Sequence, residues 1–297
     1  MKAQHTYFKD SFALKEILDT LLLPSNASLF TYDAISMYTK IDTNDCIERL
    51  SNLLQSPDTL RRFTHYSPDA LISAIKLVML NNRMWFGDIV VRQTMGIAMG
   101  MSPAPAIANL YIAAYEQPHL LPYLPKPILF LKRFIDDGFG IWLHDANPDV
   151  NENNWQEFKN KVNQSGLTWT FSTRSLQATF LDMTISIENG RLATQLFKKP
   201  GALQLFIPPR SCQPPGVLTG LIMGNVLCIF RLCSKDQDIT KELNLFFEAI
   251  LTRGYQASTI TPIFEKAINN AKNYIKLPTK YWEKKKLQKN QLSTKHC

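Results

Sequence analysis

The sequence lacks several patterns that define common protein classes. Its five cysteines form no CxxC pair, and its five histidines lie far from them, so neither a zinc site nor a disulfide framework is indicated. No apolar run follows the first charges, which argues against a signal peptide. The longest apolar stretch, residues 217–230, has 14 residues and is too short to cross a bilayer. There is no internal repeat. These absences predict an intracellular globular protein with no membrane partner.

Charge is unevenly distributed along the chain. The net charge is +8, and residues 276–297 carry seven lysines against the single acid Glu283. With Tyr281 and Trp282, this tail could bind nucleic-acid phosphates and bases, bind an acidic membrane surface, or simply be a solvated end. Charge alone does not choose among these three.

The spacing of apolar residues predicts an α+β part followed by a helical part. Capping residues and turn residues mark most of the expected boundaries. Helices are expected at 11–24, 42–56, 67–82, the alanine-rich stretch before 117, 154–164, and from Asp238 and Thr261 onward. Strands are expected from 29, in hairpins around Gly87-Asp88 and Asp136-Asp137, and at 167–173, 179–187 and 191–198. The predicted divisions are 1–199, a proline-rich connector at 200–215, helices over 216–276 and a basic tail over 277–297.

Two adjacent aspartates interrupt an otherwise apolar hairpin, LKRFIDDGFGIW at residues 131–142. Because like charges repel, Asp136 and Asp137 must be solvated, as in an ordinary turn, or bound to a cation. Asp33 is a further carboxylate in a predicted strand, where aspartate is disfavoured. If the two segments are neighbours, three carboxylates would converge on a site suited to Mg²⁺. Such a site could serve nucleotidyl transfer or a nuclease, so the acids alone do not fix the reaction.

The residues around these acids add a more specific pattern. The chain contains, in order, DAISMYTKI, RQTMGIAMGMSPAPAIANLYIAAYE, RFIDDGF and FLD. This order resembles motifs A, B, C and E of reverse transcriptases, and it is most similar to those of Penelope-like retroelements. The resemblance covers about residues 10–275. It implies a right-hand polymerase palm, an antiparallel sheet backed by helices, followed by a helical thumb. It also implies RNA-templated DNA synthesis with an RNA template, a DNA primer and deoxynucleoside triphosphates as partners.

The resemblance also implies roles for particular residues. Asp33, Asp136 and Asp137 would be the catalytic acids and the ligands of Mg²⁺ or Mn²⁺. Tyr38 matches the aromatic residue that excludes a ribose 2′-hydroxyl. The implied nucleotide-binding residues are Tyr38, Gln93, Gly100 and Lys198, and the implied primer and template residues are Asn109, Phe180, Leu181 and Asp182. Outside the resemblance, these residues suit ordinary roles in a core, a turn or a solvated strand end.

The sequence departs from the family pattern in several places. Ala104 replaces the motif B serine, Phe134 replaces the motif C tyrosine, and Arg174 is the only base in the stretch where motif D supplies a lysine. Since only 32 residues precede Asp33, we expect the fingers that hold the triphosphate to be largely missing from this sequence, which predicts reduced or lost activity. A nucleic-acid-binding remnant and a metal-dependent nuclease are the alternatives. Since a reverse transcriptase that primes at chromosomal DNA must reach the nucleus, a nuclear location is also implied.

Overall fold

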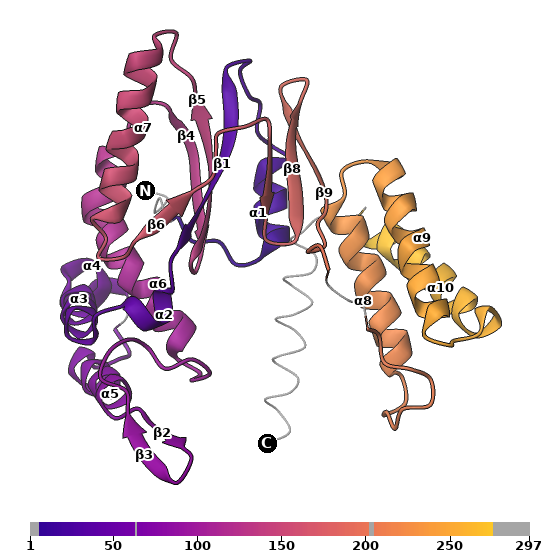
Figure 1. Cartoon of the computed structure of the whole chain (residues 1–297), viewed down its shortest axis with the longest axis horizontal. Coiled ribbons are helices and arrows are strands. Elements are labelled where there is room, and N and C mark those ends of the chain that lie inside the picture. Colours follow the sequence, from indigo (N-terminus) through magenta and orange to yellow (C-terminus); the bar gives the residue numbers. More distant parts are fainter. Residues whose placement is uncertain (1–5, 63, 202–204, 276–297) are drawn as a thin grey trace. The chain divides into compact units, whose positions relative to one another are not determined.

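The computed structural model describes residues 6–62, 64–201 and 205–275 (Figure 1). It is a mixed structure of helices and antiparallel sheets that divides into two compact units. The first unit comprises Met1–Leu181 with Ser186–Leu192, and the second comprises Asp182–Ile185 with Ala193–Cys297. The predicted basic tail lies outside the described residues. No helix in the described part is long and apolar enough to span a membrane.

A four-stranded sheet forms the centre of the first unit, with strand order β4-β5-β1-β6 (Figure 1). All its neighbouring strands are antiparallel. The hairpin predicted around the paired aspartates is confirmed, with β4 and β5 separated only by residues 135 and 136. Its strands are β1 (Ala27–Ala34), β4 (Ile128–Phe134), β5 (Asp137–Leu143) and β6 (Trp169–Phe171).

Successive side chains of β1 point to opposite faces of the sheet, and the two faces differ in character. Phe30 and Tyr32 are buried on one face, where the Phe30 ring lies 4.9 Å from the Trp155 ring of α7 (Pro148–Asn163). Gly138 lies opposite Tyr32 in the register, and a Cβ there would overlap the Tyr32 ring. The aromatic face of β1 therefore requires glycine on β5. Asp33, one residue further along β1, lies on the opposite face.

The remaining helices of the first unit mostly begin where the sequence predicts. Asp42 caps α3 (Thr43–Gln55) by accepting from the Asp45 N–H, and Ser67 caps α5 (Pro68–Leu80) in the same way. The hairpin with Gly87-Asp88 at its turn is also confirmed. The other elements are α1 (Ser11–Leu18), α2 (Met37–Lys40), α4 (Pro57–Arg62), β2 (Arg83–Phe86), β3 (Ile89–Arg92), α6 (Ala104–Tyr115), a π-helical turn η1 (Glu116–Leu120) and a 3-10 turn η2 (Leu121–Tyr123).

Some predicted boundaries are wrong. α1 ends at Leu18 rather than 24, and α7 begins at Pro148 rather than 154, because Asn147 caps it and proline suits the first turn. The strand expected at 179–187 is two strands, β7 (Gln177–Phe180) and β8 (Met183–Glu188). Leu181 lies between them with φ 50°, a conformation that ends a strand. With β9 (Arg191–Leu196) they form a sheet of order β7-β8-β9.

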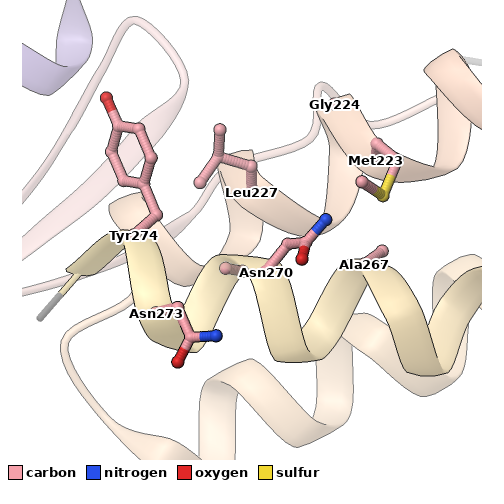
Figure 2. Close-up of a pocket in the computed structure, with 8 residues that line it drawn as sticks. Met223, Gly224, Leu227, Ala267, Asn270, Asn273 and Tyr274 are labelled. Carbon is pink, nitrogen blue, oxygen red and sulfur yellow. The ribbon is translucent and has the colours of Figure 1, made fainter. Parts of the chain in front are cut away.

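The described residues of the second unit form three helices, α8 (Val217–Leu232), α9 (Asp236–Thr252) and α10 (Ala257–Ile275). Two of them begin earlier than predicted, so Asp238 lies in the first turn of α9 and Pro262 lies inside α10. Ile222, Phe246 and Ile260 are among the buried residues of their shared core. A pocket of about 420 Å³ lies between α8 and α10, and Figure 2 shows residues that line it, among them Leu227 and Asn270.

Candidate active site

Two of the predicted acids meet at one end of the central sheet. Asp33 on β1 lies directly across from Asp137 on β5, and the Ala34 N–H donates to the Asp136 carbonyl at 3.0 Å. Partial burial and then the negative charge of Asp136 raise the pKa of Asp33 above its ordinary value. The charge of Asp136 is therefore close enough to disfavour ionisation of Asp33, and the two segments are neighbours, as the sequence predicted.

The donor set suits a hard cation. Asp137 shares a sheet face with Asp33, since directly paired residues on antiparallel strands point to the same side. Among the described residues, no three His, Cys, Asp or Glu side chains gather closely enough to hold a metal by themselves. Mg²⁺ is commonly held by one or two carboxylates, with water and substrate phosphates completing its shell. Asp33 and Asp136 provide such a pair.

The turn that carries Asp136 is held by a buried arginine. Arg133 is fully buried, and its guanidinium binds the Glu116 carboxylate through two nitrogens, at 2.9 and 3.0 Å. Its Nη1 also donates to the Ile135 carbonyl at 2.6 Å and to Asn109 Oδ1 at 3.0 Å. Ile135 has φ 54°, a strained conformation for a β-branched residue. Arg133 therefore fixes a strained peptide directly before Asp136.

This network gives Asn109 a structural partner that the sequence did not predict. Asn109 was assigned to primer and template contact, whereas its side-chain oxygen accepts from Arg133. The Thr6 hydroxyl also donates to Glu116, so the segment before α1 joins the same network. The arginine belongs to the quoted RFIDD motif, but its partners Glu116 and Asn109 lie 17 and 24 positions away in the chain, and only the fold reveals them.

Tyr38 lies in the electrostatic field of the same site. It is half-buried in α2, and burial followed by the charge of Asp136 raises the pKa of its phenol. Its backbone carbonyl accepts from the Ile97 N–H at 2.6 Å. Gly96 has φ 87°, and a Cβ there would meet this carbonyl and the Thr39 backbone. The glycine loop of motif B thus packs against the short helix that carries Tyr38.

The other two motif B residues have separate local roles. The Gln93 N–H donates to the Asn82 carbonyl at 2.9 Å, and its side-chain amide donates to the Met95 carbonyl at 2.8 Å. Gly100 has φ 90° with open space beside it, so its conformation rather than a close contact favours glycine. Nucleotide binding by Gln93 and Gly100 stays a prediction.

The residues assigned to motif E and the K-P element have other contacts in their own units. In the first unit, Phe180 is buried and its ring lies 5.6 Å from that of Phe139, and Leu181 forms the turn described above. In the second unit, the Asp182 carbonyl accepts from the Phe197 N–H, and Lys198 pairs with Glu242 at 2.7 Å. Primer contact by the first three and nucleotide contact by Lys198 stay predictions.

Two basic residues of the first unit, Arg174 and Lys132, lie on different faces of the central sheet. Arg174 pairs with Glu152 at 2.8 Å and lies over the rings of Trp142 and Trp155, so it is engaged on the aromatic face. Lys132 lies on the face of Asp33, as the pairings of β4 with β5 show. Burial lowers the pKa of Lys132. The motif pattern does not include this lysine. Its position two residues before Phe134 on a strand could have indicated it, because such residues share a sheet face.

Comparisons with known proteins identify the fold. Neither a protein-family model nor a curated protein matches the sequence. Among solved structures, the chain is similar to telomerase from Candida albicans in complex with a TWJ fragment of telomeric RNA, with a TM-score of 0.62 and 10% identity over 90% of this chain and 47% of that one. It is also similar to apo telomerase from Candida tropicalis, with a TM-score of 0.51 and 14% identity over 90% of this chain and 50% of that one.

The similarity establishes a polymerase-like fold. The chain spans about half the length of the telomerase chains that it matches. At identities this low the likeness concerns the fold alone, and function has to be argued from the residues at the end of β1 and in the turn between β4 and β5.

Proposed function

We propose that this chain is the reverse-transcriptase part of a Penelope-like retroelement protein. It would extend a DNA primer from its 3′-hydroxyl on an RNA template, using deoxynucleoside triphosphates. The central sheet with its helices would be the palm, and α8 to α10 would be the thumb. The observation that carries this proposal is the position of Asp136 near Asp33 and Tyr38, on a fold similar to that of telomerase.

In this proposal the acids hold two Mg²⁺ or Mn²⁺ ions. Asp33 and Asp136 would be the main ligands, and Asp137, which lies across from Asp33 on the same sheet face, would be the second acid of the motif. When bound, such ions activate the attacking hydroxyl and stabilise the leaving oxygen of an in-line phosphoryl transfer. Burial and the charge of Asp136 raise the pKa of Asp33, and a bound divalent cation would offset the repulsion between the two carboxylates.

The other residues would position the substrates. Tyr38 would lie against the sugar of the incoming nucleotide and exclude a 2′-hydroxyl. Lys132 lies two residues before Phe134, roughly 7 Å along the strand, and would bind a phosphate of the primer. Arg133 and Asn109 would act indirectly, by holding the turn before Asp136. A nuclear location would follow if the protein primes on chromosomal DNA.

Primer extension tests the proposal directly. A labelled DNA primer on an RNA template is incubated with the chain, deoxynucleotides, and Mg²⁺ or Mn²⁺. We expect extension that Asp136→Asn abolishes, whereas Asp69→Asn, at an exposed acid in the first turn of α5, should leave it unchanged. Shortening of either strand would identify a nuclease instead, and a mobility shift without extension would identify a binding protein.

Sugar selectivity tests the assignment of Tyr38. We expect Tyr38→Ala to incorporate ribonucleotides far more readily than the wild-type chain, because the ring no longer fills the space of the 2′-hydroxyl. Tyr38→Phe keeps the ring and should keep the selectivity. The measurement is the ratio of kcat/KM for a deoxynucleotide and its ribonucleotide. An unchanged ratio in Tyr38→Ala would remove the assignment.

A further inference from the structure

The β2–β3 hairpin exposes an unusual amount of apolar and aromatic surface. Trp85 is 76% exposed and Phe86 is 75% exposed, and Met84, Ile89 and Val90 are each about half exposed. Single exposed apolar residues are ordinary on protein surfaces, but a contiguous group on one hairpin indicates a binding surface. None of these residues belongs to the candidate active site. The hairpin is therefore a second candidate site in the first unit.

The register of the hairpin separates its two faces. Arg83 is paired directly with Arg92, and Trp85 is paired directly with Val90. Since side chains two positions apart on a strand share a face, the two arginines and Trp85 lie on one face. The pairs Met84 with Val91 and Phe86 with Ile89 lie on the other, which carries no charge.

The arginine pair indicates what binds the first face. Like charges directly opposite each other destabilise an antiparallel pair. Within the described residues, neither Arg83 nor Arg92 has an ion pair or a side-chain hydrogen bond that would offset this repulsion. An anion between them would do so. A phosphate group suits two neighbouring arginines, because a guanidinium group can bind phosphate through two donors.

We propose that the face formed by Arg83, Arg92, Trp85 and Val90 binds single-stranded nucleic acid. The arginines would hold a backbone phosphate, and the indole of Trp85 would stack on an adjacent base. Both contacts are independent of base sequence, as a polymerase requires of a surface that handles a template strand. The choice of a nucleic acid over another polyanion rests on the proposed function as well as on the charge.

Fluorescence anisotropy of a labelled single-stranded 16-mer, as RNA and as DNA, tests this proposal on the full chain. Trp85→Ala should weaken binding about 5- to 100-fold, the range found when one stacked base loses its aromatic partner. Trp85→Phe should retain most of the affinity. Phe86→Ala is the matched control, because Phe86 is equally exposed on the opposite face, and it should change the affinity less than twofold.

The salt dependence of binding tests the arginines separately. Changing both Arg83 and Arg92 to serine should reduce the slope of log affinity against log salt by about 0.7, since the two arginines hold one phosphate and each phosphate contact to a single strand contributes about that amount. Asp136→Asn should bind as the wild type does, so binding and polymerisation can fail independently. If the wild type binds RNA but does not extend primers, the proposed function fails and this inference stands.

Three results would overturn the inference. One is Trp85→Ala binding within twofold of the wild type while its circular dichroism is unchanged. Another is an equal loss of affinity in Phe86→Ala and Trp85→Ala, which would show that exposed apolar surface rather than the arginine-bearing face is responsible. The third is self-association of the wild type that Trp85→Ala abolishes without changing RNA affinity, which would make a second copy of the chain the occupant.

Discussion

Replacing Arg133 with methionine would test whether one buried ion pair holds the turn of the candidate active site. The side chain of Arg133 is 0% exposed and that of Glu116 is 5% exposed, and the two groups share two hydrogen bonds. Removing one partner of such a pair leaves the other charge buried without compensation, which typically costs about 3–5 kcal/mol. We therefore expect Arg133→Met to lower the free energy of unfolding by about that amount, measured by urea denaturation.

Two further variants separate the charge effect from general disruption. Arg61 pairs with Asp58, but both side chains are more than 70% exposed, so Arg61→Met should cost less than about 0.5 kcal/mol. The double variant Arg133→Met/Glu116→Leu removes both buried charges and should be at least about 1 kcal/mol more stable than Arg133→Met alone. A loss below about 1 kcal/mol in Arg133→Met, or a double variant less stable than the single, would refute the reasoning.

The double variant also has a functional readout. It lacks the guanidinium that donates to the Ile135 carbonyl. The strained peptide before Asp136 therefore loses this hydrogen bond, even if the double variant recovers part of the free energy of unfolding. If the chain extends primers, kcat should fall at least about tenfold, with a smaller change in KM, because the loss concerns the reacting centre. An unchanged kcat would show that the network supports the fold only.

Three other predictions concern the same sheet. Gly138→Ala should lower the free energy of unfolding by at least about 1 kcal/mol, because the new Cβ would overlap the Tyr32 ring. Gly220→Ala, in open space on α8, should not lower it, and equal effects of the two variants in urea denaturation would contradict this reasoning. Asp136→Asn should stabilise the metal-free protein at pH 7 by a few tenths to about 1 kcal/mol, because the charge that raises the pKa of Asp33 is removed, and a lower unfolding midpoint would count against it. The affinity for Mn²⁺, measured by electron paramagnetic resonance, should fall as the pH is lowered through the raised pKa of Asp33. If the affinity falls only near the ordinary aspartate pKa, burial and repulsion do not raise the pKa at this site.

Titration of Asp33 should also affect the stability of the metal-free chain, but in the opposite direction to its effect on Mn²⁺ affinity. A carboxyl whose pKa is raised in the folded state binds protons more readily there than in the unfolded chain. Its contribution therefore favours folding below the ordinary aspartate pKa and is lost as the pH rises through the raised pKa of Asp33. Because Asp33 is exposed, this contribution is small, and it opposes the gain in metal affinity over the same range.

Local sequence signals predicted most elements of the first unit. Asp42 and Ser67 cap their helices as expected, and Gly87-Asp88 and the paired aspartates form hairpin turns. These signals succeed because capping and turn formation depend on residues within four positions of each other. They fail where a distant contact or one backbone angle decides, as at Leu181, whose positive φ divides the stretch predicted as one strand into two.

The sequence predicted that Asp33 and Asp136 would be neighbours, but it did not predict the side chains that hold their surroundings in place. The order of the motifs placed Asp33 and Asp136 together, and the register of β1 with β5 brings their strands side by side. The sequence did not indicate that Asn109 would bind Arg133, or that Arg174 would lie between Glu152 and two tryptophan rings. Such partners are set by packing among helices and strands far apart in the chain.

By itself, the sequence determined the helical and strand periodicity, the turn residues, and the set of acids and aromatic residues available for chemistry. These are properties of neighbouring residues, and the chain carries them in any conformation. Only the tertiary structure decided which charges meet. It placed Asp136 near enough to raise the pKa of Asp33, buried Arg133 against Glu116, and left Arg83 facing Arg92 on an exposed hairpin. Electrostatic energies depend on distance and burial, and both are fixed only when the strands pair and the helices pack.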